Sequence, residues 1–202
     1  MIALVDYGMG NLRSVLNAFD SIGAPIEVVA EPEAVVAADR VVLPGVGAFR
    51  DAIGALRERG LAQAVRDATA AGRPLLGLCL GMQLLATRSS EFGEHRGLDL
   101  IPGSVERLQT TPGLRIPHVG WNDLDVRRPD DPIVGGLGPE PTFYYVHSYE
   151  FQPDDPASVT GVTDYGRPVT ATVGSENVFG VQFHPEKSAA DGLALLRAFV
   201  AC

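Results

Sequence analysis

The chain has 202 residues, of which 46% are hydrophobic, and it carries a formal net charge of −9 at pH 7. This length and apolar content predict a single domain, residues 1–202, with a full hydrophobic core. The negative charge, with no offsetting basic cluster, argues against a nucleic-acid partner. No apolar run reaches the roughly 18 residues of a membrane span. The N-terminus lacks the basic start of a signal peptide, and two cysteines do not make a disulfide framework. We therefore expect a soluble, cytoplasmic protein with no membrane partner.

The first part of the chain alternates predicted strands and helices. A strand at residues 2–7 leads through the turn Gly8-Met9-Gly10 to Asn11, which is placed to cap a helix with apolar residues at helical spacing as far as Ile22. Further strands are predicted at residues 26–30, 40–43 and 75–78, and helices at about 51–59 and 61–71. Such alternation with short connections indicates a parallel sheet covered by helices.

After about residue 90 the pattern changes to short β-like runs separated by Gly, Pro and Asp. These runs are residues 103–108, 142–151, 158–162, 169–173 and 178–183, and an amphipathic helix at 193–200 closes the chain. They predict antiparallel or mixed strands beside the parallel part. The predicted fold class is therefore α/β, with a largely parallel central sheet flanked by helices and an added antiparallel or mixed β section in the C-terminal half.

The most informative motif surrounds Cys79, at the end of the apolar run 75–78. A Gly-x-Cys-x-Gly turn there joins the predicted strand to a helix-like stretch, residues 82–86. This is the strand, sharp turn and helix of a nucleophile elbow, with sulfur in place of oxygen. Gly77 and Gly81 suit the strained turn, because side chains there would clash as strand and helix approach. A helix N-terminus beside the sulfur favours a thiolate.

A base and a carboxylate follow about a hundred residues later, in His184-Pro185-Glu186. Pro185 biases His184 to an extended conformation, in which residues two apart point the same way. Glu186 can then orient the imidazole while its other nitrogen meets the thiol of Cys79. The three residues predict a Cys-His-Glu triad, against the plainer interpretation of a buried small hydrophobe and a structural histidine.

Other site types are less well supported. Gly8-Met9-Gly10 resembles the start of a dinucleotide fingerprint, but Arg13 stands where a third glycine is needed. No Gly-Lys-Ser/Thr phosphate loop is present, and a zinc site lacks paired Cys or His spacing. The backbone of the Pro44-Gly45-Val46-Gly47 turn can instead serve an oxyanion.

Lys187 is the single lysine among sixteen basic residues, and it adjoins the predicted triad. In an arginine-rich chain, its retention indicates a compact point charge that the planar guanidinium of arginine does not reproduce. The alternative is that one lysine survives by chance.

With these motifs in view, the chain resembles the class I glutamine amidotransferases, and within them the glutaminase subunits of imidazole glycerol phosphate synthase. The resemblance runs essentially end to end. The elbow and His-Pro-Glu belong to the whole superfamily, whereas residues 6–15 and 117–122 are specific to this branch. Departures are mild: Val119 where the family usually has Met, and Tyr145 where it often has Phe. Two further segments, 144–149 and 179–188, also match.

The resemblance implies hydrolysis of L-glutamine through a thioester on Cys79, with the ammonia passing to a cyclase subunit in a heterodimer for histidine synthesis. It implies oxyanion donors at the backbone N–H groups of Leu80 and Val46. It implies no cofactor and no metal. The remaining implied roles are glutamine binding by Gly47, Gln83, Ser148 and Tyr149, and contact with the cyclase by His118, Trp121, Asn122 and Lys187.

Three alternatives stay open from the sequence. A sister glutaminase would serve anthranilate, aminodeoxychorismate or pyridoxal phosphate synthesis. A free-standing cysteine hydrolase would need no partner, and a silent binding subunit would use no triad at all. We also expect low basal activity without a partner, because half of the proposed site lies on loops near the predicted interface.

Overall fold

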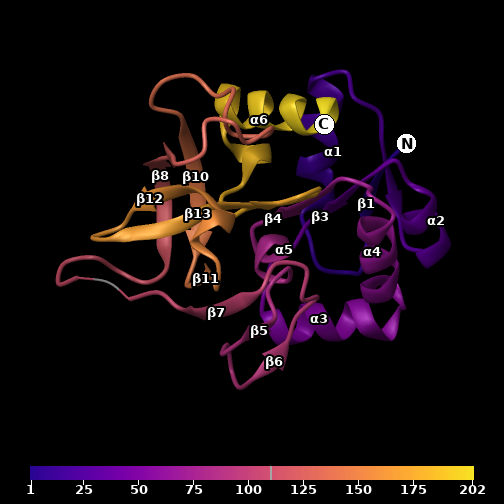
Figure 1. Cartoon of the computed structure of the whole chain (residues 1–202), viewed down its shortest axis with the longest axis horizontal. Helices are drawn as coiled ribbons and strands as arrows, with labels where there is room; N and C mark the ends of the chain where they lie inside the picture. The colour runs from indigo at the N-terminus through magenta and orange to yellow at the C-terminus, as the bar shows by residue number, and fades with distance from the viewer. Residues whose placement is uncertain (110) are drawn as a thin grey trace.

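The computed structural model describes residues 1–109 and 111–202. The strands of its largest sheet are β1 (Ile2–Val5), β2 (Ile26–Val29), β3 (Arg40–Leu43), β4 (Leu75–Leu78), β9 (Asp125–Val126), β12 (Val159–Asp164), β13 (Pro168–Ser175) and β14 (Val178–Val181). They lie in the order β2-β1-β3-β4-β14-β13-β12-β9 (Figure 1). The pairs from β2 to β14 are parallel, and those from β14 to β9 are antiparallel.

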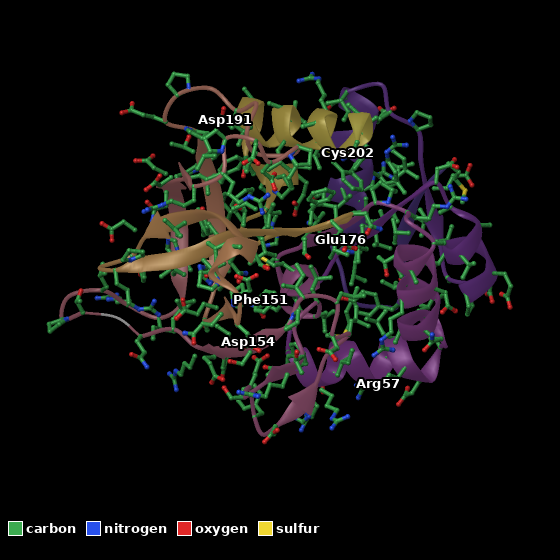
Figure 2. The ribbon with its side chains drawn as sticks, in the orientation of Figure 1. Arg57, Phe151, Asp154, Glu176, Asp191 and Cys202 are labelled. Carbon is green, nitrogen blue, oxygen red and sulfur yellow. The ribbon has the colours of Figure 1, made fainter. Side chains whose placement is uncertain are left out.

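The described residues also form two smaller sheets. One pairs β8 (His118–Asp123) with β10 (Thr142–His147) in antiparallel fashion. The other has the order β11-β7-β5-β6, built from β11 (Tyr149–Pro153), β7 (Gly103–Arg107), β5 (Arg88–Ser89) and β6 (His95–Arg96). Phe151, labelled near the centre of Figure 2, is fully buried and anchors β11 in the core.

Helices cover both faces of the large sheet. The α-helices are α1 (Leu12–Ser21), α2 (Pro32–Ala37), α3 (Phe49–Glu58), α4 (Leu61–Ala70), α5 (Leu80–Gln83) and α6 (Ala189–Ala201). Apolar residues of α1 and α6 pack with one face of the strands, and those of α2, α3 and α4 pack with the other. In Figure 1, α1 and α6 lie above the sheet, and α3 and α4 lie below it. Successive residues of β1 alternate between these two cores, as expected for a strand buried on both faces.

The expected α/β architecture is confirmed, with differences in detail. Asn11 caps α1, since its side-chain oxygen accepts a hydrogen bond from the N–H of Ser14. The helix α2 was not predicted. It begins with Pro32 at its first turn, a position that suits proline because its missing N–H has no partner there. The helix after the elbow is wrongly placed in the sequence-based prediction: α5 starts directly after Cys79 and ends at Gln83.

The C-terminal half differs more. The run 142–151, predicted as one strand, is two strands in different sheets, because the chain leaves β10 at His147 and pairs with β7 from Tyr149 onward. The strand predicted at 178–183 is β14, which pairs in parallel with β4 on one side and antiparallel with β13 on the other. The strand β8 was not predicted. No helix among the described residues has the length and apolar character to cross a membrane.

Candidate active site

Cys79 lies at a strained turn between β4 and α5. Its backbone has φ 53° and ψ −109°, a positive φ that non-glycine residues rarely adopt. A Cβ on Gly81 would lie 1.9 Å from the carbonyl oxygen of Leu43, and one on Gly77 would lie 2.7 Å from the backbone of Gly81. The turn therefore needs glycine on both sides of the nucleophile, as the sequence predicted.

The topology of the sheet brings His184 to Cys79. The strands β4 and β14 are parallel neighbours, with Leu78 beside Val181, so their carboxyl ends meet at one edge of the sheet. The N–H of Cys79 donates to the carbonyl of Val181 at 2.8 Å, and His184 follows three residues later. The N–H of His184 is held in turn by the carbonyl of Tyr144 on β10, at 2.9 Å.

Glu186 orients His184, although by a different geometry from the one expected. His184 is extended, with φ −103° and ψ 93°, as Pro185 predicts. The next residues, Pro185–Lys187, form a 3₁₀ turn and not an extended chain. Glu186 reaches back within this turn, and its Oε1 accepts a hydrogen bond from Nδ1 of His184 at 2.8 Å.

The electrostatics of this group favour a charged imidazole. Burial opposes protonation of His184, but the hydrogen bonds and negative charges of Cys79 and Glu186 outweigh it and raise its pKa to about 10. The side chains of His184 and Glu186 are both buried. At neutral pH, His184 therefore carries a proton that it can deliver to a leaving group.

The triad opens onto a cleft of about 360 Å³. Cys79 and His184 line it, whereas Glu186 lies behind His184. The other predicted residues that line it are Val46, Gly47, Leu80, Gln83, Ser148, Tyr149 and Lys187; those not predicted are Glu91, Pro117, Val146 and His147. The structure thus gathers all of the predicted oxyanion and substrate residues around one cavity.

A chain of amide side chains ties the nucleophile to the cleft wall. Nε2 of Gln83 donates to the carbonyl of Tyr149 at 3.0 Å and to Oε1 of Gln182 at 2.9 Å. Nε2 of Gln182 lies 3.7 Å from Sγ of Cys79, and the carbonyl of Val146 lies 3.8 Å from the same sulfur. Gln182 is fully buried and was not singled out from the sequence.

Glu91 is a second residue that sequence reasoning missed. It is a buried carboxylate in the wall of the cleft. Its Oε2 accepts a hydrogen bond from the N–H of Phe49, the first residue of α3, at 2.7 Å. A buried acid at the cleft matches the positive ammonium group of an amino-acid ligand.

The 44–47 turn packs directly on the elbow. A Cβ on Gly45 would lie 2.9 Å from Cβ of Leu80, and the hydroxyl of Tyr7 donates to the carbonyl of Pro44 at 2.7 Å. Gly47 has a φ of +95°. These contacts place Val46 and Gly47 in the wall of the cleft, beside the start of α5.

Of the predicted partner residues, Trp121 and Lys187 lie at the surface. Trp121 is 56% exposed and packs edge-on against Tyr144, with ring centroids 6.1 Å apart. Val119 and Val146 face each other across β8 and β10 and are also exposed. Together, Val119, Trp121, Tyr144 and Val146 form an outer apolar face beside the mouth of the cleft.

His118 and Asn122 lie elsewhere. His118 is only 2% exposed, and it points to the inner side of β8, toward His147. Asn122 is half-buried, and its Nδ2 donates to the carbonyl of Asp164 at 2.8 Å. The side chain of His118 is therefore buried in this structure, whereas the resemblance implies a place at the partner surface.

The comparisons with known proteins agree with this site. The family model "Glutamine amidotransferase class-I" matches residues 3–201. The imidazole glycerol phosphate synthase subunit HisH of Moorella thermoacetica is 48% identical over 198 residues, which cover 98% of this chain and 93% of that relative. The subunit of the same name from Syntrophotalea carbinolica is 47% identical and covers 98% of both chains. The chain belongs to the HisH family of class-I glutamine amidotransferases.

Solved structures share the fold of this HisH-family chain at lower identity. A structure titled as a glutamine amidotransferase superposes with a TM-score of 0.78 at 23% identity, over 100% of this chain and 98% of that one. A structure titled PurLQS from Thermotoga maritima gives a TM-score of 0.77 at 22% identity, over 99% of this chain and 97% of that one.

Within residues 1–109 and 111–202, no group of three or more His, Cys, Asp or Glu side chains is arranged to hold a metal ion.

Proposed function

We propose that this chain is the glutaminase subunit of imidazole glycerol phosphate synthase. It hydrolyses L-glutamine to glutamate and ammonia and supplies the ammonia to a cyclase subunit for histidine synthesis. The observation that carries the proposal is Cys79 at a glycine-flanked elbow, beside a protonated His184 held by Glu186. The names of the relatives support the choice of synthase.

The chemistry follows from the positions of these three side chains. Sγ of Cys79 attacks the side-chain amide carbon of glutamine, and the proton from the thiol resides on His184. His184 delivers this proton to the departing ammonia, which leaves a glutamyl thioester on Cys79. His184 then takes a proton from water, and the resulting attack on the thioester releases glutamate and restores the sulfur.

Each tetrahedral intermediate places a negative oxygen beside the start of α5. We assign the two donors to the N–H of Leu80, which follows the nucleophile, and to the N–H of Val46 on the facing turn. The close packing of Gly45 on Leu80 supports this assignment. Each such donor typically lowers the barrier by about 3 kcal/mol.

The rest of the cleft suits the remainder of the glutamine molecule. Glu91 is placed to bind the α-ammonium group, because it is the acidic side chain that lines the cleft beside the nucleophile. Gln83, Gly47 and the Ser148–Tyr149 segment line the same cleft and are available for the rest of the molecule. With these assignments, the α-ammonium group of glutamine is paired with the carboxylate of Glu91, and the side-chain amide lies at Sγ of Cys79.

The cyclase is expected to dock on the outer apolar face of Val119, Trp121, Tyr144 and Val146. Exposed aromatic and aliphatic side chains at the mouth of an active site are typical of a protein interface. Lys187 is exposed at the same mouth and provides a positive charge for an acidic group of the partner. Docking there would cover the cleft, so that ammonia passes to the partner instead of to solvent.

The test is glutamate release with a panel of acceptor enzymes. The purified chain is assayed alone, with the histidine-pathway cyclase and its nucleotide substrate, and with the acceptor enzymes of anthranilate, aminodeoxychorismate and pyridoxal phosphate synthesis. We expect strong stimulation by the cyclase only. Stimulation by another acceptor would move the chain to a sister glutaminase, and full activity of the chain alone would indicate a free-standing hydrolase.

A further inference from the structure

The inner side of the β8–β10 sheet carries two histidines whose role the triad does not explain. His118 and His147 are directly opposite each other across the two strands, and both are buried. The ring of His118 stacks on Tyr145 at a centroid distance of 4.8 Å and on Tyr165 at 4.0 Å. His147 lies at the end of β10 and lines the catalytic cleft.

The two rings belong to a hydrogen-bond chain that begins and ends on backbone carbonyls. At one end, Nδ2 of Asn122 lies 2.8 Å from the carbonyl of Asp164 and 3.3 Å from Nε2 of His118. In the middle, Nδ1 of His118 lies 3.0 Å from Nε2 of His147. At the other end, Nδ1 of His147 lies 2.9 Å from the carbonyl of Tyr149.

These contacts allow only one arrangement of protons. A carbonyl oxygen can only accept, so Asn122 must donate from Nδ2 and His147 must donate from Nδ1. Nε2 of His118 then accepts, and its Nδ1–H donates to the bare Nε2 of His147. Both histidines are therefore neutral and both hold their proton on Nδ1, and an additional proton on either ring would place two donors face to face.

The surroundings also favour neutral rings. Tyr145 and Tyr165 stack on His118, and His184 acts on His147, which lines the same cleft as Cys79 and Glu91. Burial lowers the pKa of His118 to about 4. Burial, with a contribution from the imidazoles of His118 and His184, lowers the pKa of His147 to about 4, although the hydrogen bond to the carbonyl of Tyr149 acts in the opposite direction.

The hydrogen-bond chain ends at Tyr149, in the wall of the proposed substrate site. The carbonyl of Tyr149 accepts hydrogen bonds from both His147 and Gln83, at 2.9 Å and 3.0 Å. The neighbouring carbonyl of Ser148 accepts from the N–H of Leu108 at 2.9 Å. Ser148 lies between β10 and β11, and Tyr149 is the first residue of β11, opposite Arg107 at the end of β7. The position of the segment therefore depends on these hydrogen bonds together with the last pair of the β7–β11 ladder.

We propose that His118 and His147 are a neutral positioning pair, which holds the Ser148–Tyr149 segment in the position that glutamine binding requires. This inference rests on the proposed glutaminase function. Neither histidine is a catalytic residue, because both nitrogens of each ring already take part in this chain of hydrogen bonds. The pair also gives His118 a role that the sequence does not reveal, because it acts from inside the sheet and not at an interface.

The first test reads the tautomers directly. Imidazole ¹⁵N spectra of the full chain at pH 7 are assigned with His95→Asn, His118→Asn and His147→Asn, since the sequence has four histidines. We expect the Nδ1–H neutral tautomer for both His118 and His147, which is the less common form in free histidine. An Nε2–H tautomer or a charged ring at either position would overturn the proposal.

The second test compares two replacements of His118 in the complex with the cyclase. His118→Leu removes the donor to His147, and the loss of one buried hydrogen bond predicts a KM for glutamine raised about 10-fold, with a smaller change in kcat. His118→Asn keeps a donor near the position of Nδ1, and we expect it to restore most of the KM. His95→Asn on β6, outside the cleft, is the matched control and should leave both constants unchanged.

The outcomes separate this proposal from the function on which it rests. An unchanged KM in His118→Leu, or equal effects of the Leu and Asn variants, would overturn the positioning role. The glutaminase function would still hold in that case, provided that the wild-type complex turns over glutamine. Absence of glutamine turnover in the wild-type complex would overturn the function, and the role of the pair toward glutamine with it. If His118→Leu does not fold, the tautomers of the wild-type chain still decide.

Discussion

Glu186 acts on the reaction only through His184, and this makes it the clearest single residue to change. Its hydrogen bond and charge help to raise the pKa of His184. Glu186→Gln should lower that pKa and reduce kcat for glutamine by about 10²- to 10⁴-fold with little change in KM, because the general acid loses its orientation. Steady-state kinetics and the pH profile of the complex measure both effects.

The control for Glu186 is another glutamate of the same β14 region. Glu176, labelled in Figure 2, is exposed at the turn before β14, at the opposite end of this strand from the triad. Glu176→Gln should behave as the wild type. Equal losses in the two variants would show that the effect is one of charge or folding and not of the triad.

The buried histidines predict a dependence of stability on acid. Because the native pKa values of His118 and His147 lie near 4 and the ordinary value is 6.5, the unfolded chain binds more protons in this window. Their contribution to stability is present above pH 6.5 and is lost as the pH falls toward 4, on the order of 3 kcal/mol for a fully buried ring. The free energy of unfolding, measured in urea from pH 7 to pH 4.5, should fall less in His118→Phe than in the wild type. An equal fall in the two proteins would contradict this prediction.

At this scale, the sequence indicates the triad but not all of its surroundings. Cys79, His184 and Glu186 stand in short motifs with chemical meaning, so they are recognisable one segment at a time. Gln182 and Glu91 carry no such signal, because a glutamine inside an apolar run and an acid in a loop are common. Their places in the site come from tertiary contacts, to Cys79 in one case and to Phe49 in the other.

Among the elements, the elbow depends most strongly on glycine. A Cβ on Gly81 would overlap the carbonyl oxygen of Leu43, so Gly81→Ala should destabilise the fold by more than about 3 kcal/mol and abolish activity. Gly54 in α3 is the matched control, since nothing lies within 4 Å of its Cβ position. Gly54→Ala should add about 0.5–1 kcal/mol in urea unfolding, through its better helix propensity. Similar effects of the two changes would contradict the described elbow.

Strand alternation explains which side chains of β8 were misplaced from the sequence. His118 and Trp121 are three residues apart, so in a strand they must face opposite sides. The resemblance implies that His118, Trp121 and Asn122 all face the cyclase, whereas strand alternation separates the buried His118 from the exposed Trp121. In the same way, no local signal marks Ser148 as the break between β10 and β11, because the strands end where their partners β8 and β7 end.

For the whole molecule, the outer apolar face predicts a separation between stability and assembly. Trp121→Ala should leave the free energy of unfolding nearly unchanged, because the ring is 56% exposed. It should raise the Kd for the cyclase by about 30-fold, because an aromatic anchor contributes about 2 kcal/mol to the free energy of binding. Calorimetric titration measures this, with Val36→Ala on α2 as an exposed apolar control. Equal Kd values for Trp121→Ala and the wild type would place the interface elsewhere.

The arrangement of the chain explains how distant residues reach one site. The parallel half supplies the nucleophile at the end of β4, and the C-terminal half returns β14 beside it with the base. Alternating strands and helices in the first half indicate the parallel sheet from the sequence. The insertion of β14 next to β4 has no local signature, because the pairing of strands a hundred residues apart is a property of the folded molecule.

The most direct measurement is labelling of the complex by a glutamine-like electrophile, with peptide mass analysis. The chain contains an internal control, since Cys202 is a second free thiol whose pKa is raised by burial. We predict one adduct, on Cys79, which glutamine suppresses and which is lost in Cys79→Ser and strongly slowed in His184→Ala. Equal labelling of Cys202, or labelling of Cys79 that glutamine does not suppress, would contradict a glutamine-binding catalytic cysteine.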